Sequence, residues 1–461
     1  MNASAVLLAM APEHLLLAGI VALLVLEIFS DRPNAALPLA VAFVAAAAGA
    51  AAWLGFTGYV GAPFPGQFDL TPPASFAKAL VLALAVPVLL FSKDDFGRGE
   101  FYPLILSSLY GICLLASAES FLTLFLGIEL MSIPVYVLVL LGYRRPESAE
   151  AALKYLVLSG TASASFLMGA SLMYGSTGSL ALESFALAIG SPRLLAGTAV
   201  VMVVSAFFLK AAIVPFHGWA PDAYEAASVP STAFMAVLVK VGVLIAAARV
   251  FGTAHVAEPL AGLLPILPLA SIVWGNLAAI RQAGLRRMIA YSSIAHAGYL
   301  FFAFLGDGPG RFQAVMFYLA AYGVMNLLAF AALPSHPDDT ERDKLDNLKG
   351  LFHTHPLAAL LMGMAMLSLA GIPPFPGFIG KFLIFKNVMA AGYTTYAVLG
   401  LVGSYLGIYF YLRVIQLMFM SPAEGPAEPR TVVRRAVGTC IVCLVPALLL
   451  ALFPGAVIGR G

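Results

Sequence analysis

Hydrophobic residues fall into long runs along this chain, and short polar segments separate the runs. A helix needs about twenty apolar residues to cross the hydrocarbon core of a bilayer, and most of the runs reach that length. The pattern therefore predicts an all-α, multi-pass membrane protein with about fourteen transmembrane helices. A short interfacial helix is expected at 179–190, and one long polar loop at 335–355. The expected spans are 11–29, 35–55, 74–91, 101–118, 120–142, 149–174, 194–228, 230–252, 260–280, 285–306, 311–334, 356–391, 394–420 and 433–455.

Lysine and arginine residues provide a check on the number of spans, because cytoplasmic loops of membrane proteins are rich in them. Most of the cations between spans follow odd-numbered spans, which predicts that both termini lie on the periplasmic or outer side. A miscounted span would scramble this alternation. The cations after odd-numbered spans are Arg32, Lys93, Arg98, Arg144, Arg145, Arg281, Arg286, Arg287, Arg342, Lys344, Lys349, Arg430, Arg434 and Arg435. Those on the other side are Arg193, Arg249, Arg311 and Arg460.

Two of the spans are too long for one crossing, and the same residue pattern interrupts both near the middle. The pattern is Ile-x-Pro-Phe-x-Gly-aromatic, and it occupies 213–219 and 372–378. Proline removes a backbone donor and glycine loosens a helix, so backbone groups are freed at membrane depth. They need protein or water as partners there. The alternative is that both are ordinary proline kinks.

The interrupted spans are the seventh and the twelfth, so they are five spans apart. An odd displacement reverses the orientation in the membrane, which predicts two inverted five-helix repeats, each with a discontinuous helix. Discontinuous helices of this kind mark ion sites near the midplane of transporters. We expect one transmembrane domain over 1–461, with repeat one at about 101–252, repeat two at about 260–420, and peripheral helices within 11–91 and 433–455.

Charged residues make up only 10% of the chain, against about 25% in soluble domains. Insertion of a charged side chain at the bilayer centre costs at least about 2.5 kcal/mol of free energy, so a charge there indicates a specific structural or functional role. Glu129, Lys210, Lys240 and Lys381 lie well inside apolar spans. Lys210 stands just before the first break, and Lys381 just after the second. Lys154 is a further candidate nearer the cytoplasmic end, and the alternative is that its side chain reaches toward the interface.

A buried glutamate–lysine pair can act as a proton switch. Burial penalises the ammonium form of a lysine, and a nearby carboxylate favours it. The lysine therefore holds its proton when the pair is close and releases it when the pair separates. We expect Glu129 to tune Lys210, Lys240 to receive the proton, and Lys381 to pass it to the far side.

Uncharged polar side chains within the spans are candidates for carrying water between these charges. His217 lies at the first break, and Tyr291, Ser292, Ser293 and His296 lie in the tenth span. Two alternatives stay open. His217 serves only to cap freed backbone, or His296 is a hydrogen-bonded core histidine without a transport role.

Metal and nucleotide sites are not expected in this chain. Cys113, Cys440 and Cys443 all fall in apolar runs, and zinc or iron–sulfur ligation normally needs about four ligands. The chain carries no nucleotide-binding fingerprint. We therefore expect no metal and no cofactor in this chain, and no nucleic-acid partner.

The stretch 210–240, KAAIVPFHGWAPDAYEAASVPSTAFMAVLVK, resembles the signature of the antiporter-like subunits of respiratory complex I and of multisubunit sodium/proton antiporters. The runs WAPDAY at 219–224, EAALKY at 150–155 and YSSIAHAGY at 291–299 are similar to the subunit N branch of that family. A lysine at 381 differs from the glutamate of subunit M, and a long lateral helix typical of subunit L is not evident.

This resemblance implies an antiporter-like domain and a proton-translocating role within NADH–quinone oxidoreductase, a translocase. Glu129 and the lysines would form half-channels and a central axis, and the redox chemistry would occur in other subunits. The implied partners are the neighbouring antiporter-like and small membrane subunits of complex I, and the lipid bilayer. The implied location is the cell inner membrane.

Two other functions remain open from the sequence. The chain could be a subunit of a multisubunit sodium/proton antiporter with no link to electron transfer. It could also be an assembly scaffold whose charges no longer conduct. Neighbouring genes, or proteins that copurify, would discriminate among the three.

Overall fold

The computed structural model describes residues 3–29, 35–94, 96, 100–142, 145–253, 260, 262–306, 310–334, 343–422 and 434–452. Several of the cations used to predict the topology therefore lie outside the described residues: Arg32, Arg98, Arg144, Arg342, Arg430 and Arg460. The chain divides into two compact units. Unit 1 comprises 1–211 and 238–259, and unit 2 comprises 212–237 and 260–461.

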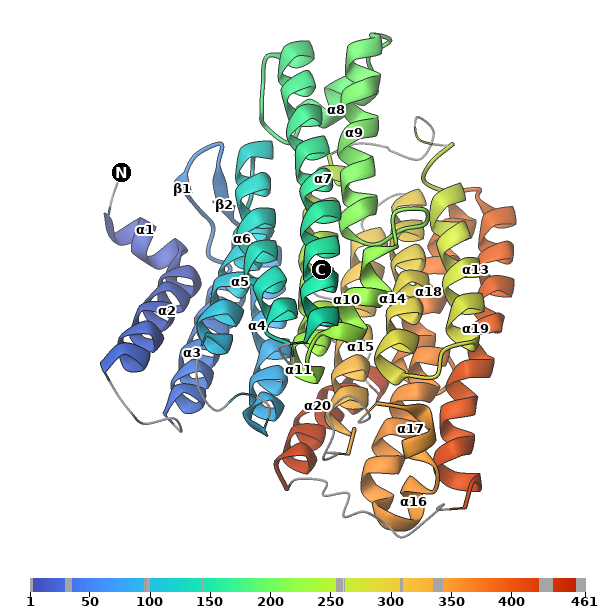
Figure 1. Ribbon diagram of the computed structural model, residues 1–461. Coiled ribbons are helices and arrows are strands. Elements are labelled where there is room, and N and C mark those ends of the chain that lie inside the picture. Colours follow the sequence, from blue (N-terminus) through green and yellow to red (C-terminus); the bar gives the residue numbers. More distant parts are fainter. Residues whose placement is uncertain are drawn as a thin grey trace. The chain divides into compact units, whose positions relative to one another are not determined.

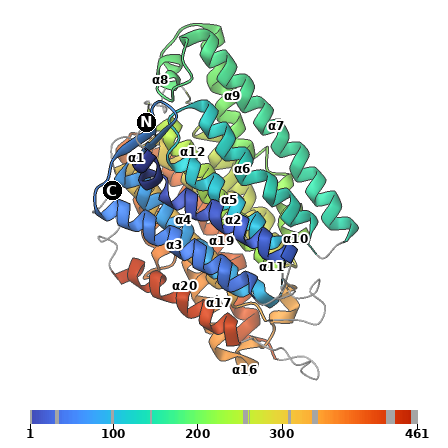
Figure 2. The ribbon, with the colours of Figure 1, turned by 90° about the vertical axis from the view of Figure 1, so that its left-hand side faces the viewer.

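In its described residues, unit 1 is built of helices that pack against their neighbours in sequence, with one small β-hairpin (Figures 1 and 2). Strands β1 and β2 of this hairpin are antiparallel. Helix α5 also packs against α2, and α12 packs against α5 and α6. The elements are α1 (Ala3–Ala9), α2 (Ala11–Phe29), α3 (Ala36–Phe56), β1 (Gly61–Phe64), β2 (Phe68–Leu70), α4 (Pro72–Phe91), η1 (Ser92–Asp94), α5 (Phe101–Ala116), α6 (Phe121–Leu140), α7 (Pro146–Thr177), α8 (Ser184–Ile189), α9 (Leu194–Lys210) and α12 (Lys240–Phe251).

Unit 2 is also helical in its described part. Helix α14 packs against α13 and α10, and α18 packs against α15 and α17. The elements are α10 (Trp219–Ala226), α11 (Val229–Phe234), α13 (Ile266–Ile280), α14 (Leu285–Phe302), η3 (Ala303–Leu305), α15 (Gly310–Ala331), η4 (Leu345–Leu348), α16 (Leu351–Thr354), α17 (Pro356–Ala370), α18 (Pro376–Ala390), α19 (Thr394–Met420) and α20 (Arg434–Leu452). A π-helical turn, η2 (Met235–Val239), joins α11 to α12.

Local sequence signals explain several helix ends. Helix α4 begins after Thr71, whose side chain accepts from the backbone of Ala74, and proline occupies its first turn. Helix α6 begins after Ser120, which accepts from Thr123 at 3.1 Å. The long helix α7 ends at Gly178, which has φ 75° and suits a left-handed cap.

Apolar side chains cover much of the outer surface of several helices. Leu153 and Val157 on α7 and Val402 and Tyr405 on α19 are all at least 58% exposed. Such faces need lipid or a protein partner, because a water-facing surface of this kind would be costly. Within the described residues, nine helices are long and apolar enough to cross a membrane, and further apolar helices are shorter. The fold is that of an all-α membrane protein.

Every span expected from the hydrophobic pattern contains helix in this structure. The segment expected at 179–190 contains α8, and the described end of the polar loop contains η4 and α16. The number of crossings and the inverted repeats stay predictions. The hydrophobic pattern gave no indication of α1 or of the hairpin, since both are shorter than a span.

Candidate functional site

The first break begins directly after α9, whose last residue is Lys210. Its backbone is irregular, with Ala212 at φ 60° and a cis peptide bond between Val214 and Pro215. The freed amide of Val214 donates to Ser271 Oγ on α13 at 2.8 Å. A freed backbone donor at membrane depth thus finds a side-chain partner.

His217 also serves the first break. Its Nδ1 lies 3.3 Å from the carbonyl oxygen of Pro215, and the indole of Trp274 donates to its Nε2 at 2.9 Å. The indole nitrogen is a donor only, so His217 Nε2 accepts and Nδ1 carries the proton of a neutral ring. These contacts agree with the alternative in which His217 caps freed backbone.

The second break separates α17 from α18 and is closely packed. Gly371 ends α17 at φ 83°, and a cis bond joins Pro373 to Pro374, the same position of the shared pattern as in the first break. The amide of Gly377 donates to Ser368 Oγ at 3.0 Å. A Cβ at Gly377 would lie 1.9 Å from the Ser368 carbonyl oxygen, so only glycine allows this approach.

Glu129 and Lys210 come together inside unit 1, as the sequence predicts. Glu129 Oε1 lies 3.5 Å from Lys210 Nζ, and the two side chains are 23% and 6% exposed. Lys210 also donates to Ser159 Oγ at 2.7 Å and to Ser132 Oγ at 3.4 Å. Ser163 donates to the Glu129 carboxylate. Helices α6, α7 and α9 therefore share one polar cluster in an apolar setting.

A further hydroxyl group extends this cluster. Tyr136 donates to Ser159 Oγ at 2.6 Å, so Ser159 accepts from both Tyr136 and Lys210. A small cavity lies beside Lys210 and Ser163, and apolar residues of α6, α7 and α9 form the rest of its wall. A proton leaving Lys210 would thus meet hydroxyl groups at once.

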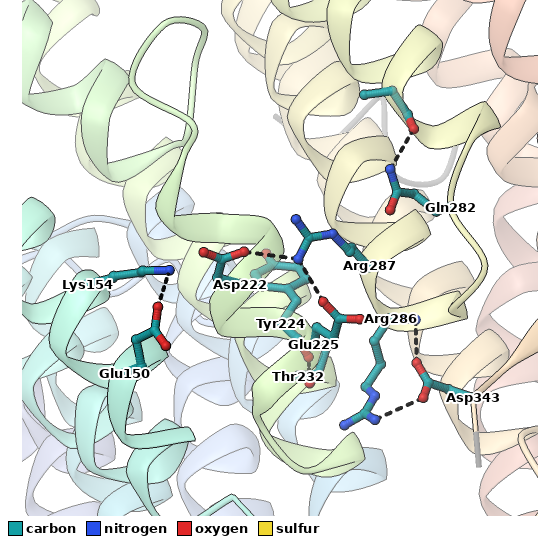
Figure 3. Close-up of polar contacts among 11 residues, drawn as sticks. Glu150, Lys154, Asp222, Tyr224, Glu225, Thr232, Gln282, Arg286, Arg287 and Asp343 are labelled. Atoms are coloured by element: carbon teal, nitrogen blue, oxygen red, sulfur yellow. Dashed lines mark hydrogen bonds and ion pairs between the residues drawn. The ribbon is translucent and has the colours of Figure 1, made fainter. Parts of the chain in front are cut away.

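Lys154 has a different setting from Lys210. Its ammonium pairs with Glu150 one helical turn earlier at 2.7 Å, and the two side chains are 46% and 67% exposed (Figure 3). An exposed i,i+4 pair of this kind contributes only a few tenths of a kcal/mol. The geometry supports the alternative in which Lys154 reaches toward the interface.

Lys240 is buried and lies at a change of helix type. It is the first residue of α12 and follows the π-helical turn η2, a feature often found at functional sites. Two residues on, a Cβ at Gly242 would lie 2.7 Å from Met131 Sδ. Met131 is two residues after Glu129, so α12 packs directly on the glutamate-bearing helix.

Lys381 is buried in unit 2 and bound mainly by backbone. Its Nζ donates to the carbonyl oxygens of Leu369 and Ala370 at 3.0 and 3.1 Å, and to Ser404 Oγ at 3.2 Å. It also lies 4.9 Å from the centre of the Tyr299 ring. The ammonium thus caps the end of α17, where the helix dipole favours a cation.

His296 lies at the centre of a buried hydroxyl network in unit 2. Its Nδ1 is 2.5 Å from Tyr318 Oη, and its Nε2 is 3.1 Å from Tyr411 Oη. Tyr411 also contacts the Ser292 hydroxyl. A histidine between two phenols can pass a proton from one ring nitrogen to the other.

A second group of hydroxyls surrounds Ser293 on the same helix. Tyr322 donates to Ser293 Oγ at 3.0 Å, and Tyr224 lies 3.4 Å from it. Tyr291, which was predicted alongside these residues, is only half-buried. Of the predicted residues, Ser292 and His296 therefore belong to the first group of hydroxyls and Ser293 to the second.

Ion pairs tie the helix after the first break to its neighbour. Arg287 on α14 contacts Asp222 at 2.9 Å and Glu225 at 2.7 Å, both on α10 (Figure 3). Arg286 contacts Asp343 at 2.9 Å. These arginines entered the topology prediction only as loop charges, and the structure gives them a bracing role at one end of unit 2.

Sequence reasoning missed the hydroxyl partners of the charges. Ser159, Ser163, Tyr318 and Tyr411 stand in apolar runs, where serine and tyrosine are too common to be informative alone. Spacing offered one weak signal, since Ser159 and Ser163 are four residues apart and therefore share a face of α7. Within the described residues, no group of three or more His, Cys, Asp or Glu side chains is arranged to hold a metal ion.

Comparison with known proteins identifies the family. Residues 118–407 match the family described as NADH:quinone oxidoreductase/Mrp antiporter, TM. A protein named NADH-quinone oxidoreductase subunit N from Pelobacter propionicus is 39% identical over 98% of this chain and 97% of its own length. The chain belongs to the subunit N family. A subunit N protein from Chloroflexus aggregans is 37% identical over 86% of this chain and 85% of its own length.

Solved structures agree with membership of the subunit N family. A chain of respiratory complex I from Thermus thermophilus, with bound aureothin, has 35% identity and a TM-score of 0.84, and the match covers 97% of this chain and 98% of that one. A chain of the Mrp complex from Dietzia sp. has a TM-score of 0.87 at 22% identity, over 98% and 96% of the two chains, which shows a shared fold. Glu129, Lys210, Lys240 and Lys381 all lie within the matched segment 118–407.

Proposed function

We propose that this chain is a proton-translocating membrane subunit of NADH–quinone oxidoreductase, the respiratory complex I. The observation that carries the proposal is the contact between the partly buried Glu129 and the buried Lys210, directly before the first helix break, in a chain of the subunit N family. A charge pair inside an apolar protein is costly, and such residues in membranes mark ion and proton pathways.

The proton switch has a direct structural basis. Lys210 is the last residue of α9, so a change in the irregular backbone after it would move the ammonium relative to Glu129. With the pair closed, the carboxylate and Ser159 stabilise the ammonium; with the pair open, burial favours release. Lys240 is the acceptor we assign, and Lys381 the donor toward the far side.

The His296 network supplies hydrogen-bonding groups along the second half of this path. Tyr318, His296, Tyr411 and Ser292 each contact the next. Hydroxyls and imidazole both donate and accept, so they relay protons without a net charge of their own. Aromatic packing around His296 holds the ring in place.

Energy for pumping is supplied from outside this chain. We assign the redox centres to other subunits of the complex, and the enzyme activity, NADH:quinone oxidoreduction, to the whole assembly. The partners we propose are neighbouring antiporter-like and small membrane subunits, with lipid against the exposed apolar faces. The likeness to an Mrp complex shows the fold alone, so sodium/proton antiport is not the function we assign.

The proposal is tested by NADH-driven acidification of inverted membrane vesicles in sodium-free buffer. Vesicles with the complete complex should acidify, whereas a strain lacking this chain should not. Acidification that requires added sodium would favour the antiporter alternative. Full acidification without the chain would contradict the proposal.

Glu129→Gln should lower pumping only in part. The glutamine removes the charge that tunes Lys210 and keeps the shape and a partner for Ser163. An ion pair with a partly exposed member is worth up to about 1 kcal/mol, so we expect a loss of up to about fivefold in pumping rate. Initial rates of vesicle acidification measure it. A complete loss would mean that Glu129 itself carries every proton.

The predicted topology places both termini on the periplasmic side of the cell inner membrane. Single cysteines at positions 95 and 340, which lie outside the described residues, should react with a membrane-impermeant thiol reagent only from the cytoplasmic side. A cysteine at Ser191 should react only from the opposite side. Labelling of 95 and 340 from different sides would contradict the fourteen-span prediction.

A further inference from the structure

A second charge pair lies in the N-terminal helices, outside the segment 118–407 matched by the family. Glu13 Oε1 on α2 lies 2.6 Å from Lys78 Nζ on α4, and both side chains are 0% exposed. Lys78 Nζ also lies 4.6 Å from the centre of the Phe68 ring, on strand β2. The pair is more deeply buried than Glu129 and Lys210.

Hydrogen bonding at this pair is incomplete within the described part of the chain. An ammonium has three donors and a carboxylate accepts several hydrogen bonds, yet neither Glu13 nor Lys78 meets a hydrogen-bond partner there beyond their mutual contact. The buried atoms Ser75 Oγ and His14 Nε2 also have no hydrogen-bond partner in the described part of the chain. Ser75 stands three residues before Lys78, on the same face of α4. Buried polar atoms that lack protein partners are normally satisfied by water.

Stability alone does not account for such a pair. Replacement of a buried ion pair by apolar residues of similar volume is often neutral or stabilising, because desolvation offsets the attraction. Elements packed on α2 and α4 add few other titratable groups: α3 has none, and α5 brings Tyr110 and Cys113 within electrostatic range of Glu13. The titratable groups that the structure places around the pair are therefore Tyr110 and Cys113, and His14 follows Glu13 directly in the sequence.

Helix α5 packs against α2, which carries Glu13, and against α6, which carries Glu129; Figure 2 shows these three helices. One side of α5 presents Cys113 within electrostatic range of Glu13 and Lys78. Its other side meets α6 at close range: a Cβ at Gly111 would lie 2.4 Å from the Met131 amide, and Ser108 donates to the Met131 carbonyl at 2.7 Å. Met131 is two residues from Glu129. Only one helix thus separates the two charge pairs.

We propose that Glu13 and Lys78 form a second proton-binding pair of this chain, which exchanges a proton with bound water and acts on Glu129 across α5. In the uptake step the Glu13 carboxylate accepts a proton from a hydronium ion that the bound water delivers, which leaves neutral water. The pair changes from net neutral to net positive, and release to water reverses the step. This inference rests on the proposed pumping function, since it adds a second site to the same cycle.

The test uses the complete complex in membrane vesicles. The double variant Glu13→Gln/Lys78→Met removes both charges and keeps the side-chain volumes. It should assemble and reduce quinone, and it should pump about two- to fivefold less per electron pair, because a charge beyond one helix acts weakly through a medium of effective dielectric about 20. Glu27→Gln makes the same acid-to-amide change at an exposed position of α2 and should leave pumping unchanged.

Lys210→Met is measured in parallel to separate the two proposals. Unchanged pumping in the Glu13/Lys78 double variant, with pumping lost in Lys210→Met, would overturn this inference and leave the proposed function standing. Normal pumping in Lys210→Met would overturn the proposed function itself.

Infrared difference spectroscopy gives a readout that does not depend on the double variant assembling. Turnover should produce a protonated-carboxyl band that shifts in the conservative variant Glu13→Asp and does not shift in Glu27→Gln. A static structural pair gives no such band, so its absence during turnover would overturn the proposal.

Discussion

Replacing Lys210 by methionine should lower NADH-driven proton pumping by about tenfold or more, because a positioned proton-transfer group typically contributes at least a hundredfold to its own step. Methionine fills a similar volume in the apolar surroundings and cannot carry a proton. Quinone reduction coupled to pumping should fall as well. Vesicle acidification and quinone reduction, measured on the same preparation, give the proton-to-electron ratio.

The variant Lys210→Arg tests whether position 210 needs only a positive charge or a group that can release a proton. Arginine keeps a cation next to Glu129 and stays protonated in proteins, so it cannot release its proton. We therefore expect assembly with defective pumping. An arginine variant that pumps normally would mean that a fixed charge at this position suffices, and it would contradict the proton switch.

Lys381→Met should also stop most pumping, at a site in the other compact unit. The variant removes the cation that caps α17 through Leu369 and Ala370. We expect a loss of about tenfold or more, since the last transfer toward the far side would have no carrier. Lys381→Gln retains amide donors for these carbonyls without a titratable proton, so it should pump as poorly as the methionine variant.

Lys386→Met is the matched control for Lys381. Lys386 lies five residues later on the same helix and is exposed. Its loss should leave pumping unchanged. Normal turnover and pumping in Lys381→Met would show that this chain does not form a complete path, even if Lys210 proves essential.

The sequence predicted the helical framework well because apolar runs of bilayer length have one main structural solution. The two breaks were also predictable, since proline and glycine leave the same irregular backbone in both copies. The contact between Glu129 and Lys210 agrees with the expectation that a carboxylate stabilises the ammonium form of a buried lysine. All three predictions rest on residues close together in the sequence, or on the known effect of burial on charged groups.

Other parts of the site depend on packing that the sequence does not express. Glu13 and Lys78 each stand near the start of an apolar run, where a charge normally marks the interface, and only the packing of α2 against α5 and of α4 beside them reveals a buried pair. Lys154 is a second residue whose setting the sequence does not express. Its run is apolar, but its side chain faces outward next to Glu150.

The surroundings of Lys381 allow its proton to leave without stranding a neighbour. The ammonium has three N–H groups, and it meets three acceptors: the carbonyl oxygens of Leu369 and Ala370, and Ser404 Oγ. A neutral amine has only two N–H groups and one lone pair. The two carbonyls can only accept, but the Ser404 hydroxyl can rotate and donate to that lone pair. Lys381 Nζ then has three hydrogen bonds in both protonation states, and the rotation of one hydroxyl group accompanies the loss of its proton.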